Sequence, residues 1–571
     1  MSKKYITTLQ NKTDMKRDID TLAEKEFDLL VIGGGIYGAT VAWEAVLRGL
    51  SVALIEKGDF ASGTSSNSLK IIHGGLRYIQ HADFKRMRES IRERRILLKI
   101  APHLVHPLPC VMPTYGHFVK GPEALRVALL INDLVSFDRN RLDDPEKHLP
   151  NGKIISKKEL LGLLPFVDQN NLTGGAIWYD ARMYNSERLA LSFLKAAVAE
   201  GAVAANYVKA EDMLYQDDRV VGVRAREVMS GDTFNIRAKM TLNTAGPWIN
   251  NILAMLNGKT DAPKIPYSSA LNLVIKRTLS QDYAFGVSSK RVFKDQDAVI
   301  SKGSRLLFAV PWRDVTLIGT AHKPYDGDAE AYRPSEEDIA EFLQEVNEAM
   351  PDLQIARREV TFQYGGLLPM DGVNEQTGDV RLTKHFRIID HQIADGLAGL
   401  LSVMSVKYTT ARDVAEKAID LVLQKFDRQA KSQSADRRVW GGNIDRFDAF
   451  LSGQIEKYKH SFSQSVVRQL VLNYGSGMDD VLKLAQENSD LARPLSQHTN
   501  VLRAEVVYAV RHEMAQNLSD VVFRRTELAT TGHPGGEALQ SCAQLVAREL
   551  GWNAGRTAEE VAAVERCFQV K

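Results

Sequence analysis

Residues 64–78 bring together side chains that can bind phosphate and side chains that can move a proton. Hydroxyl groups donate hydrogen bonds to phosphate oxygens, and a neutral imidazole accepts a proton near neutral pH. Arginine and tyrosine can hold an anionic or polyhydroxy ligand. The loop therefore predicts a phosphate site beside a proton-transfer site. Its candidate residues are Thr64, Ser65, Ser66, Lys70, His73, Gly74, Arg77 and Tyr78.

A glycine-rich turn precedes this loop and predicts where a dinucleotide binds. Gly33, Gly35 and Gly38 satisfy the G-x-G-x-x-G pattern between an apolar run at residues 29–32 and a stretch of helix formers. The glycines permit a tight turn and a close approach of pyrophosphate, to which the helix N-terminus is attractive. Glu56 follows at the end of the next apolar run. Its carboxylate would accept from ribose hydroxyls and repel a 2′-phosphate, which favours FAD or NAD over NADP.

A further segment favours FAD. Residues 241–248 read Thr-Leu-Asn-Thr-Ala-Gly-Pro-Trp and look like the strand and turn with which two-domain flavoproteins return beside their FAD. With this segment in place, the chain resembles the FAD-dependent glycerol-3-phosphate dehydrogenases and oxidases over about residues 27–530. The resemblance is carried by residues 33–103, 243–248, 407–410, 508–515 and 524–526.

The resemblance implies an architecture of α/β plus α+β type. It consists of a Rossmann-like FAD-binding domain, an inserted antiparallel-sheet substrate domain and a helical C-terminal cap domain. We place a flexible N-terminal extension at residues 1–26, the FAD-binding domain at 27–430, a linker at 431–440 and the helical domain at 441–571. The inserted domain is expected in two pieces, at approximately 100–180 and 255–385.

The resemblance also implies oxidation of a secondary alcohol. Hydride passes to flavin N5, a base takes the hydroxyl proton, and the electrons continue to quinone or oxygen. The expected reaction is oxidation of glycerol 3-phosphate to dihydroxyacetone phosphate, or of a related polyol or polyol phosphate. Two alternatives stay open: a flavin-containing homologue with a sensor or assembly role, and a flavin amine oxidase.

Positions that match the family's motifs receive roles by resemblance. His73 is the candidate base, and Arg77 and Lys407 complete the catalytic set. The predicted substrate-binding residues are Arg77, Tyr78, Asn272, His322, Leu368 and Lys407. The predicted FAD-binding residues are Gly33, Gly35, Gly38, Glu56, Thr64, Ser65, Ser66, Lys70, His73, Gly74, Val208, Ala245, Gly246, Trp248, Lys407 and Thr409.

Three substrate-side positions depart from the family. Where the family usually has Gly-x-Arg-Pro, this chain has Leu368 in place of the arginine. Asn272 stands where the family usually has histidine. The usual Gly-Gly before the flavin-side lysine becomes Ser405-Val406. Losing one charge-assisted partner typically costs about 1.5–3 kcal/mol, or roughly one to two orders of magnitude in affinity. We interpret the pattern as a retained flavin site with an altered substrate pocket.

The amino-acid composition excludes several other classes of protein function. The 571 residues carry 73 Lys and Arg against 71 Asp and Glu, a balance that gives no reason to expect nucleic-acid binding. Three dispersed cysteines, Cys110, Cys542 and Cys567, argue against a disulfide framework, and no metal site is expected. No secretory signal and no apolar run of about 18 residues is present, so we expect a cytoplasmic protein or one peripheral to the inner face of the cytoplasmic membrane.

A basic stretch at residues 84–100 could contact a membrane or a second subunit. Its apolar positions follow a helical period, and its charges indicate a solvated face over a core. The alternatives are contact with anionic lipid headgroups, or an active-site or subunit contact. A peripheral membrane contact and a homodimer therefore stay open.

Overall fold

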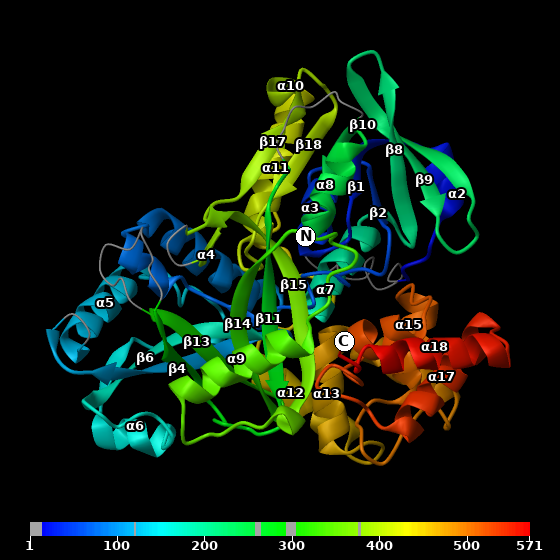
Figure 1. The fold of residues 1–571 in the computed structure, drawn as a ribbon. Helices are drawn as coiled ribbons and strands as arrows, with labels where there is room; N and C mark the ends of the chain where they lie inside the picture. The colour runs from blue at the N-terminus through cyan, green and yellow to red at the C-terminus, as the bar shows by residue number, and fades with distance from the viewer. Residues whose placement is uncertain (1–13, 119–120, 257–263, 293–303, 375–377, 571) are drawn as a thin grey trace.

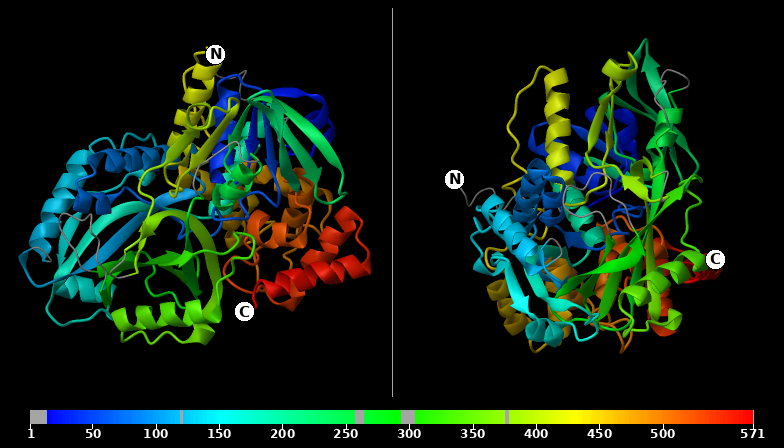
Figure 2. Two further views of the ribbon diagram at one scale, coloured as in Figure 1. Left: turned by 45° about the horizontal axis from the view of Figure 1, so that its top comes forward. Right: turned by 60° about the vertical axis from the view of Figure 1, so that its left-hand side comes forward.

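The structure is a computed structural model that describes residues 14–118, 121–256, 264–292, 304–374 and 378–570. Two large sheets meet in the middle of the molecule, and a helical domain packs beside them (Figures 1 and 2). None of the helices in these ranges is long and apolar enough to cross a bilayer.

The first sheet has β1 (Glu26–Ile32) at its centre, in parallel register with β2 (Val52–Glu56) and β10 (Thr233–Asn243). Alternate residues of β1 are buried in different cores, Leu29 and Val31 in one, Leu30 and Ile32 in the other. Both faces are thus covered, which is why the strand reads as a continuous apolar run. The other strands are β7 (Val203–Asn206), β8 (Val208–Gln216), β9 (Arg219–Glu227), β17 (Arg387–Asp390) and β18 (Leu400–Met404).

Helices cover this sheet. The core on one face includes α3 (Ile36–Leu47), α7 (Ser186–Ala199) and α11 (Ala411–Lys425), which bury Ala, Val, Leu and Trp side chains. The other face carries the β8–β9 hairpin, α2 (Ile19–Glu24) and α8 (Ile249–Ala254). Short α10 (His391–Ala394) follows β17. The arrangement confirms the predicted Rossmann-like domain.

The second sheet is predominantly antiparallel, with only β12 and β4 running parallel among its described strands. Helices α6 (Lys157–Leu163) and α9 (Glu336–Ala349) pack on it. Its strands are β3 (Ile71–Ile72), β4 (Val105–Tyr115), β5 (Lys153–Ser156), β6 (Leu172–Met183), β11 (Tyr267–Ile275), β12 (Ala284–Val292), β13 (Ser304–Trp312), β14 (Val315–Tyr325), β15 (Val360–Val373) and β16 (Val380–Leu382).

The C-terminal part is helical, as predicted, and has its own apolar core. A π-helical turn at residues 521–525 faces the first sheet through buried arginines. The helices are α12 (Phe447–Tyr458), α13 (Gln464–Tyr474), α14 (Met478–Glu487), α15 (Arg503–His512), α16 (Leu518–Asp520), α17 (Gly536–Leu550) and α18 (Ala554–Arg566).

Two segments predicted to be loose are packed. Residues 1–13 of the predicted extension lie outside the described residues, but residues 14–26 are docked: Met15 is buried, and Arg17 pairs with Glu227. In the predicted linker, Ser434 is fully buried and accepts a hydrogen bond of 3.1 Å from Arg412. Polar composition misled the prediction in both places because buried partners satisfy the polar groups.

The basic helix α4 (Phe84–Ile100) has the predicted bounds and covers a core with Met87 and Ile91, but several of its charges are paired within the protein rather than left to solvent or lipid. Arg94 is buried against Asp180 at 2.6 Å, and Glu93 is buried against Arg412 at 2.7 Å. Arg88 pairs with Asp138 at 2.7 Å. These charges are used to join α4 to neighbouring elements. The exposed apolar helix lies next to it, at α5 (Pro122–Val135).

A buried charge cluster joins the first domain to the helical one. Glu513, at the end of α15, accepts from Arg188 at 2.7 Å and from Lys195 at 2.8 Å, and both cations come from α7. Burial raises the pKa of the Glu513 carboxyl, but the charges of Arg188 and Lys195 outweigh it and lower that pKa to about 2. Removing the carboxylate would leave two cations buried without a counter-charge.

We therefore expect Glu513→Gln to lower the free energy of unfolding by about 3–5 kcal/mol in urea titrations at neutral pH. The wild-type contribution is present above the ordinary carboxyl pKa of about 4.3 and disappears as pH falls toward the folded-state value. The control is Glu456→Gln, whose partner Lys459 lies on the surface. It should cost less than about 1 kcal/mol. Equal losses in the two variants would contradict the prediction.

Candidate active site

The glycine turn after β1 has the geometry that its motif predicts. Gly33 has φ +105°, and a Cβ there would lie 2.8 Å from the carbonyl oxygen of Thr244. A Cβ on Gly38 would lie 1.8 Å from the carbonyl oxygen of Gly33. Helix α3 can therefore start against the end of β1 only because both positions lack side chains.

Groups suited to a dinucleotide surround this turn. The Ile36 amide at the N-terminus of α3 donates to Ser65 Oγ at 2.9 Å, so Ser65 marks where an anion would meet the helix. Glu56 ends β2 and accepts from the amides of Gly34 at 2.8 Å and Gly58 at 2.9 Å. Burial raises the pKa of the Glu56 carboxyl. Its place at the strand end suits a ribose acceptor.

The turn after β10 closes the same region. The Ala245 Cα lies 2.9 Å from where a Gly33 Cβ would be, and Gly246 opens a short 3₁₀ turn that ends at Trp248. Indole Nε1 of Trp248 is buried and has no hydrogen-bond partner among the described residues. Val208, predicted as cofactor-binding, begins β8 and is fully buried. The glycine cradle, the helix N-terminus, Glu56 and this unpaired donor fit FAD.

Most hydroxyls of the following loop are used within the protein. Thr64 Oγ1 donates to the carbonyl of Leu367 at 3.0 Å, and Ser66 Oγ donates to the carbonyl of Gly63 at 3.2 Å. Of the three predicted phosphate-binding hydroxyls, Ser65 is the one that meets the α3 N-terminus. The other two hold the loop against β15 and in its own turn.

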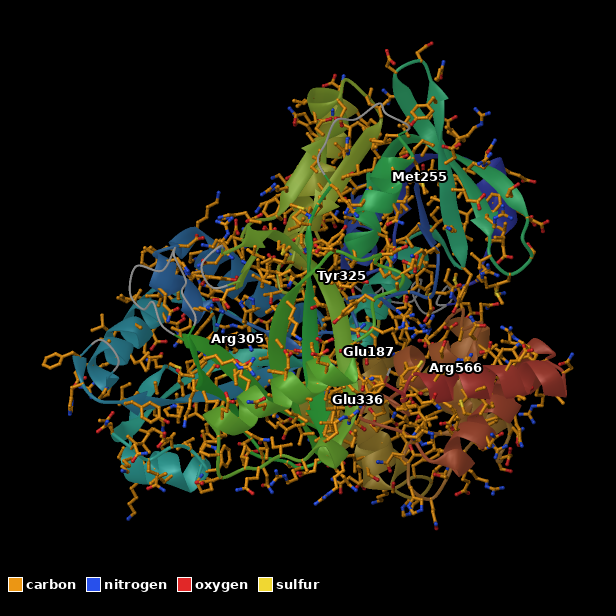
Figure 3. All side chains as sticks on the ribbon, in the orientation of Figure 1. Glu187, Met255, Arg305, Tyr325, Glu336 and Arg566 are labelled. Atoms are coloured by element: carbon orange, nitrogen blue, oxygen red, sulfur yellow. The ribbon has the colours of Figure 1, made fainter. Side chains whose placement is uncertain are left out.

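Lys70 is predicted to lie close to the flavin, and the structure shows how its ammonium is held. Its ammonium is fully buried and donates to Ser66 O at 2.9 Å, Ser186 Oγ at 2.8 Å and Glu187 Oε2 at 2.7 Å. Glu187 lies in the interior, near the meeting of the sheets (Figure 3). Because an ammonium has three donors, none is left for a cofactor. Lys70 anchors the loop to α7.

His73 follows β3 directly and lies over a buried charge pair. The amide of Gly74 donates to Asp180 Oδ1 at 2.5 Å, and Arg94 donates to the same oxygen at 2.6 Å. A Cβ on Gly74 would meet Arg94 Nη1 at 2.3 Å. Gly74 is predicted to contact the cofactor, and in the structure its amide donates to Asp180. This hydrogen bond also fixes the backbone next to His73.

The pKa of His73 is lower than the sequence suggested. Burial, and then the charge of Lys407, lowers it to about 4, so the imidazole is neutral at pH 7. Its ring lies 5.9 Å from the Tyr78 ring, edge to face. Lys407 Nζ lies 4.4 Å from the Tyr78 ring centroid. His73, Tyr78 and Lys407 therefore form one cluster, although Lys407 is more than 300 residues away in the sequence.

Of the other predicted substrate-binding residues, some are accessible and some are buried within the protein. Arg77 is exposed on the 3₁₀ turn after His73, and its charge contributes, after burial and Arg305, to lowering the pKa of His322 to about 4. Asn272 is buried and tied up: its Oδ1 accepts from Thr320 at 2.7 Å and its Nδ2 donates to Asn67 O at 3.3 Å. Asn272 thus holds the loop to β11 and is a structural residue here.

Leu368 lies half-buried on β15, paired with Ser268 of β11. The same sheet places His322 of β14 on the other side of β11. The predicted aliphatic replacement is therefore on the substrate-domain sheet, where the loop with Thr64 also docks. Thr409 is buried at the start of the α11 turn.

Sequence reasoning missed Tyr37, a variable position of the glycine motif. Its hydroxyl donates to Lys407 O at 2.6 Å and lies 2.6 Å from Ser405 Oγ. This contact explains part of the Ser405-Val406 departure, since Ser405 supplies a partner that glycine could not. The pairing of a motif tyrosine with a distant serine leaves no signal in a single sequence.

Comparisons with known proteins agree with this geometry. The family model "FAD dependent oxidoreductase" matches residues 28–397, and "C-terminal domain of alpha-glycerophosphate oxidase" matches residues 432–557. A glycerol-3-phosphate dehydrogenase of Synechocystis is 31% identical, covering 94% of this chain and 95% of the relative. The chain belongs to the FAD-dependent glycerol-3-phosphate dehydrogenase family.

Other members of the family support the same assignment. The human mitochondrial glycerol-3-phosphate dehydrogenase is 30% identical, over 94% of this chain and 72% of the relative. The structure of the glycerol-3-phosphate dehydrogenase from Bacillus halodurans, complexed with FAD, has a TM-score of 0.75 and 28% identity, with 96% of each chain covered. The predicted family, FAD as cofactor and the fold class are confirmed.

The glycine turn gives a test of cofactor binding. We expect Gly38→Ala to purify with little or no FAD, because its Cβ would overlap the Gly33 carbonyl oxygen, which is backbone and cannot move aside. The flavin-to-protein absorbance ratio measures the loss. Gly162→Ala in α6 is the control, since a Cβ there meets nothing within 4 Å. A Gly38→Ala protein with wild-type flavin content would contradict the assignment.

Proposed function

We propose that this protein oxidises the secondary alcohol of glycerol 3-phosphate or of a closely related polyol phosphate. The observation that carries the proposal is the cluster of His73, Tyr78 and Lys407 beside a dinucleotide cradle. It is supported by relatives named glycerol-3-phosphate dehydrogenase, which cover nearly the whole chain. FAD, when bound, supplies the hydride acceptor.

His73 is the proposed proton acceptor. Its imidazole is neutral at pH 7 and is held by the Gly74–Asp180 hydrogen bond. The charge of Lys407 is one reason for its low pKa. An anionic substrate group beside Lys407 would offset that charge and raise the pKa of His73 toward the value at which a base works well. Substrate binding would thereby activate its own base.

Lys407, Arg77 and Tyr78 are the proposed substrate contacts. Lys407 presents its ammonium beside the Tyr78 ring, and Arg77 follows His73 by four residues on an exposed turn. Cations in such positions hold a phosphate through charge-assisted hydrogen bonds. Leu368 offers no such contact, so the phosphate must depend on cations elsewhere in the site.

Anaerobic titration of the purified holoprotein tests the reaction. We expect glycerol 3-phosphate or a tetritol phosphate to bleach the oxidised flavin, whereas unphosphorylated glycerol should do so only at far higher concentration, because it lacks the anion that binds the cations. Amino acids serve as the control for an amine oxidase. If none of the alcohols bleaches the flavin, the proposal is wrong. If only amino acids bleach it, the protein is an amine oxidase.

The electron acceptor is proposed to be a quinone or oxygen. After reduction by substrate, the flavin should reoxidise with one of them at a rate that matches turnover. Comparing air with a water-soluble quinone under argon separates the two, since only one arm should sustain turnover if the acceptor is specific.

We further propose that the protein meets the surface of an anionic bilayer through α5. Five of the ten exposed large apolar side chains of the described chain lie here: Phe118 at 82%, Val127 at 56%, Leu130 at 59%, Leu134 at 75% and Phe137 at 70% exposed. Helix α5 lies at an outer edge of the molecule (Figure 1). Arg126 and Arg141 are exposed around it, which suits anionic headgroups.

The double variant Leu130→Glu, Leu134→Glu should lose co-sedimentation with phosphatidylglycerol vesicles, because two carboxylates would face the lipid. Ile393→Glu is the control, since Ile393 is 85% exposed on α10. If α5 instead joins two copies, the wild type is a dimer by light scattering and the double variant a monomer, with no vesicle binding by either. That outcome would replace the bilayer with a homodimer.

A further inference from the structure

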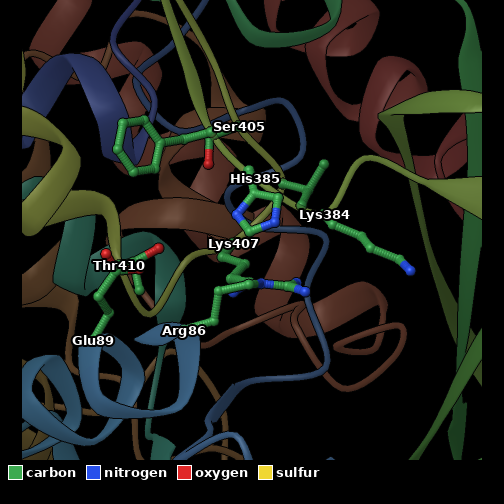
Figure 4. Close-up of a pocket in the computed structure, with 9 residues that line it drawn as sticks. Arg86, Glu89, Lys384, His385, Ser405, Lys407 and Thr410 are labelled. Carbon is green, nitrogen blue, oxygen red and sulfur yellow. The ribbon is translucent and has the colours of Figure 1, made fainter. Parts of the chain in front are cut away.

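A pocket opens beside Lys407, between three elements that are distant in the sequence (Figure 4). Helix α4 contributes Arg86 and Glu89, and the segment before β17 contributes residues 384–386. The turn between β18 and α11 contributes residues 405–407 and Thr410. This pocket lies on the side of Tyr78 where no sequence motif predicted a ligand contact other than Lys407.

Arg86 is the residue of this pocket to which no role has been given. Its side chain belongs to a residue that is only 8% exposed, and its guanidinium carbon lies 4.3 Å from the centroid of the Tyr78 ring. Lys407 Nζ lies 4.4 Å from the same centroid. Two cations thus contact one aromatic ring and line one pocket, and the charge of Arg86 is among the causes that lower the pKa of Lys407. An anion between them would offset this repulsion.

The hydrogen-bonding donors of both cations are under-used. Among the described residues, Arg86 Nε is buried without a partner, and Nη1 reaches Asp83 Oδ2 only at 3.4 Å. Lys407 Nζ has no hydrogen-bond partner within the same residues. Burying donors without acceptors is costly, so an acceptor with several oxygens would satisfy this site.

The acidic side chains around Arg86 and Lys407 do not balance the positive charge of these two residues. Glu89 lines the pocket but contacts Lys417 at 3.3 Å, and Asp83 also faces His385 at 4.0 Å. Burial, followed by the charge of Arg86, lowers the pKa of Lys407 to about 7, against the opposing effects of Glu89 and Asp83. The local acids therefore do not neutralise the pair.

We propose that Arg86 and Lys407 bind the phosphate of the substrate between them, across Tyr78. This proposal rests on the proposed function. It places phosphate recognition on α4 and not on β15, where Leu368 stands at the position at which the resemblance implies an arginine. An arginine fork can give two parallel hydrogen bonds to phosphate oxygens, and the lysine adds a point charge. Arg86 is thereby a specificity-determining residue that selects phosphorylated over neutral polyols.

Arg86→Met tests the assignment, because it keeps the length of the side chain and its packing on Tyr78 but removes the charge. Lys85→Met is the matched control, since Lys85 is the exposed neighbour on α4. We expect KM for glycerol 3-phosphate to rise about 10- to 100-fold in Arg86→Met only. The kcat/KM for unphosphorylated glycerol should be unchanged in Lys85→Met, and the ratio of kcat/KM for glycerol 3-phosphate to that for glycerol should fall only in Arg86→Met.

A binding measurement keeps the test independent of turnover. Isothermal calorimetry of the oxidised holoprotein with inorganic phosphate should show binding that Arg86→Met weakens at least about tenfold and Lys85→Met leaves unchanged. If no alcohol reduces the flavin but phosphate binding depends on Arg86, the proposed reaction fails and this site stands. Equal phosphate binding by the wild type and Arg86→Met would overturn the site, even in an active enzyme.

Arg86→Lys guards against a folding artefact. It keeps a cation over Tyr78 but loses the guanidinium fork, so phosphate affinity should lie between those of the wild type and Arg86→Met. The order wild type, Arg86→Lys, Arg86→Met at equal flavin content supports the clamp. If Arg86→Lys and Arg86→Met both bind phosphate as tightly as the wild type at equal flavin content, neither the charge nor the fork of Arg86 contributes and the proposal is wrong.

Discussion

The interactions of Asp180 hold the site together. Its carboxylate accepts from the amide of Gly74, from the guanidinium of Arg94 and, on the other oxygen, from Nε1 of Trp178 at 3.1 Å. One buried acid thus joins the site loop, helix α4 and strand β6. Because the loop links the two sheets, this junction decides where His73 lies relative to the dinucleotide cradle. A buried carboxylate with three donors is well satisfied, whereas loss of Arg94 would leave its charge unpaired.

A second group of buried charges ties the helical domain to the cofactor region. Asp59, shortly after Glu56, accepts from Arg525 at 2.7 and 2.8 Å in a two-pronged contact. Glu513 binds Arg188 and Lys195 of α7, the helix whose Glu187 holds Lys70. The C-terminal domain is therefore continuous with the supports of the site loop. Its separate apolar core gives it shape, and these ion pairs fix its position.

The two sides of the site differ in how far they follow the family. The cradle is constrained by backbone contacts, since Gly33 and Gly38 approach neighbouring carbonyls too closely for any other residue. The substrate side is built from side chains, which can be exchanged without moving the backbone. The sequence predicts that Leu368 and Asn272 are such exchanges, and in the structure Asn272 is part of the scaffold through Thr320 and Asn67. An unchanged flavin site and a different substrate contact can therefore coexist in one fold.

Features that depend on local geometry could be predicted from the amino-acid sequence. The glycine spacing, the apolar run of β1 and the acid at the end of β2 predicted the dinucleotide cradle, because each acts within a few residues of its neighbours. The bounds of α4 followed from its helical period. The motifs also identified FAD and the family through resemblance.

The partners of the charged side chains, in contrast, depend on how distant segments pack. A single sequence shows that Lys70 and α4 are basic, but not that Lys70 pairs with Glu187 or that Arg94 pairs with Asp180. It cannot show that Arg86 and Lys407 meet at Tyr78 either. The pKa of His73 depends on its burial and on Lys407, both set by packing. The sequence shows which side chains are charged. Contacts between distant segments determine the partner and the solvation of each charge, and therefore whether a cation stabilises the fold or binds a ligand.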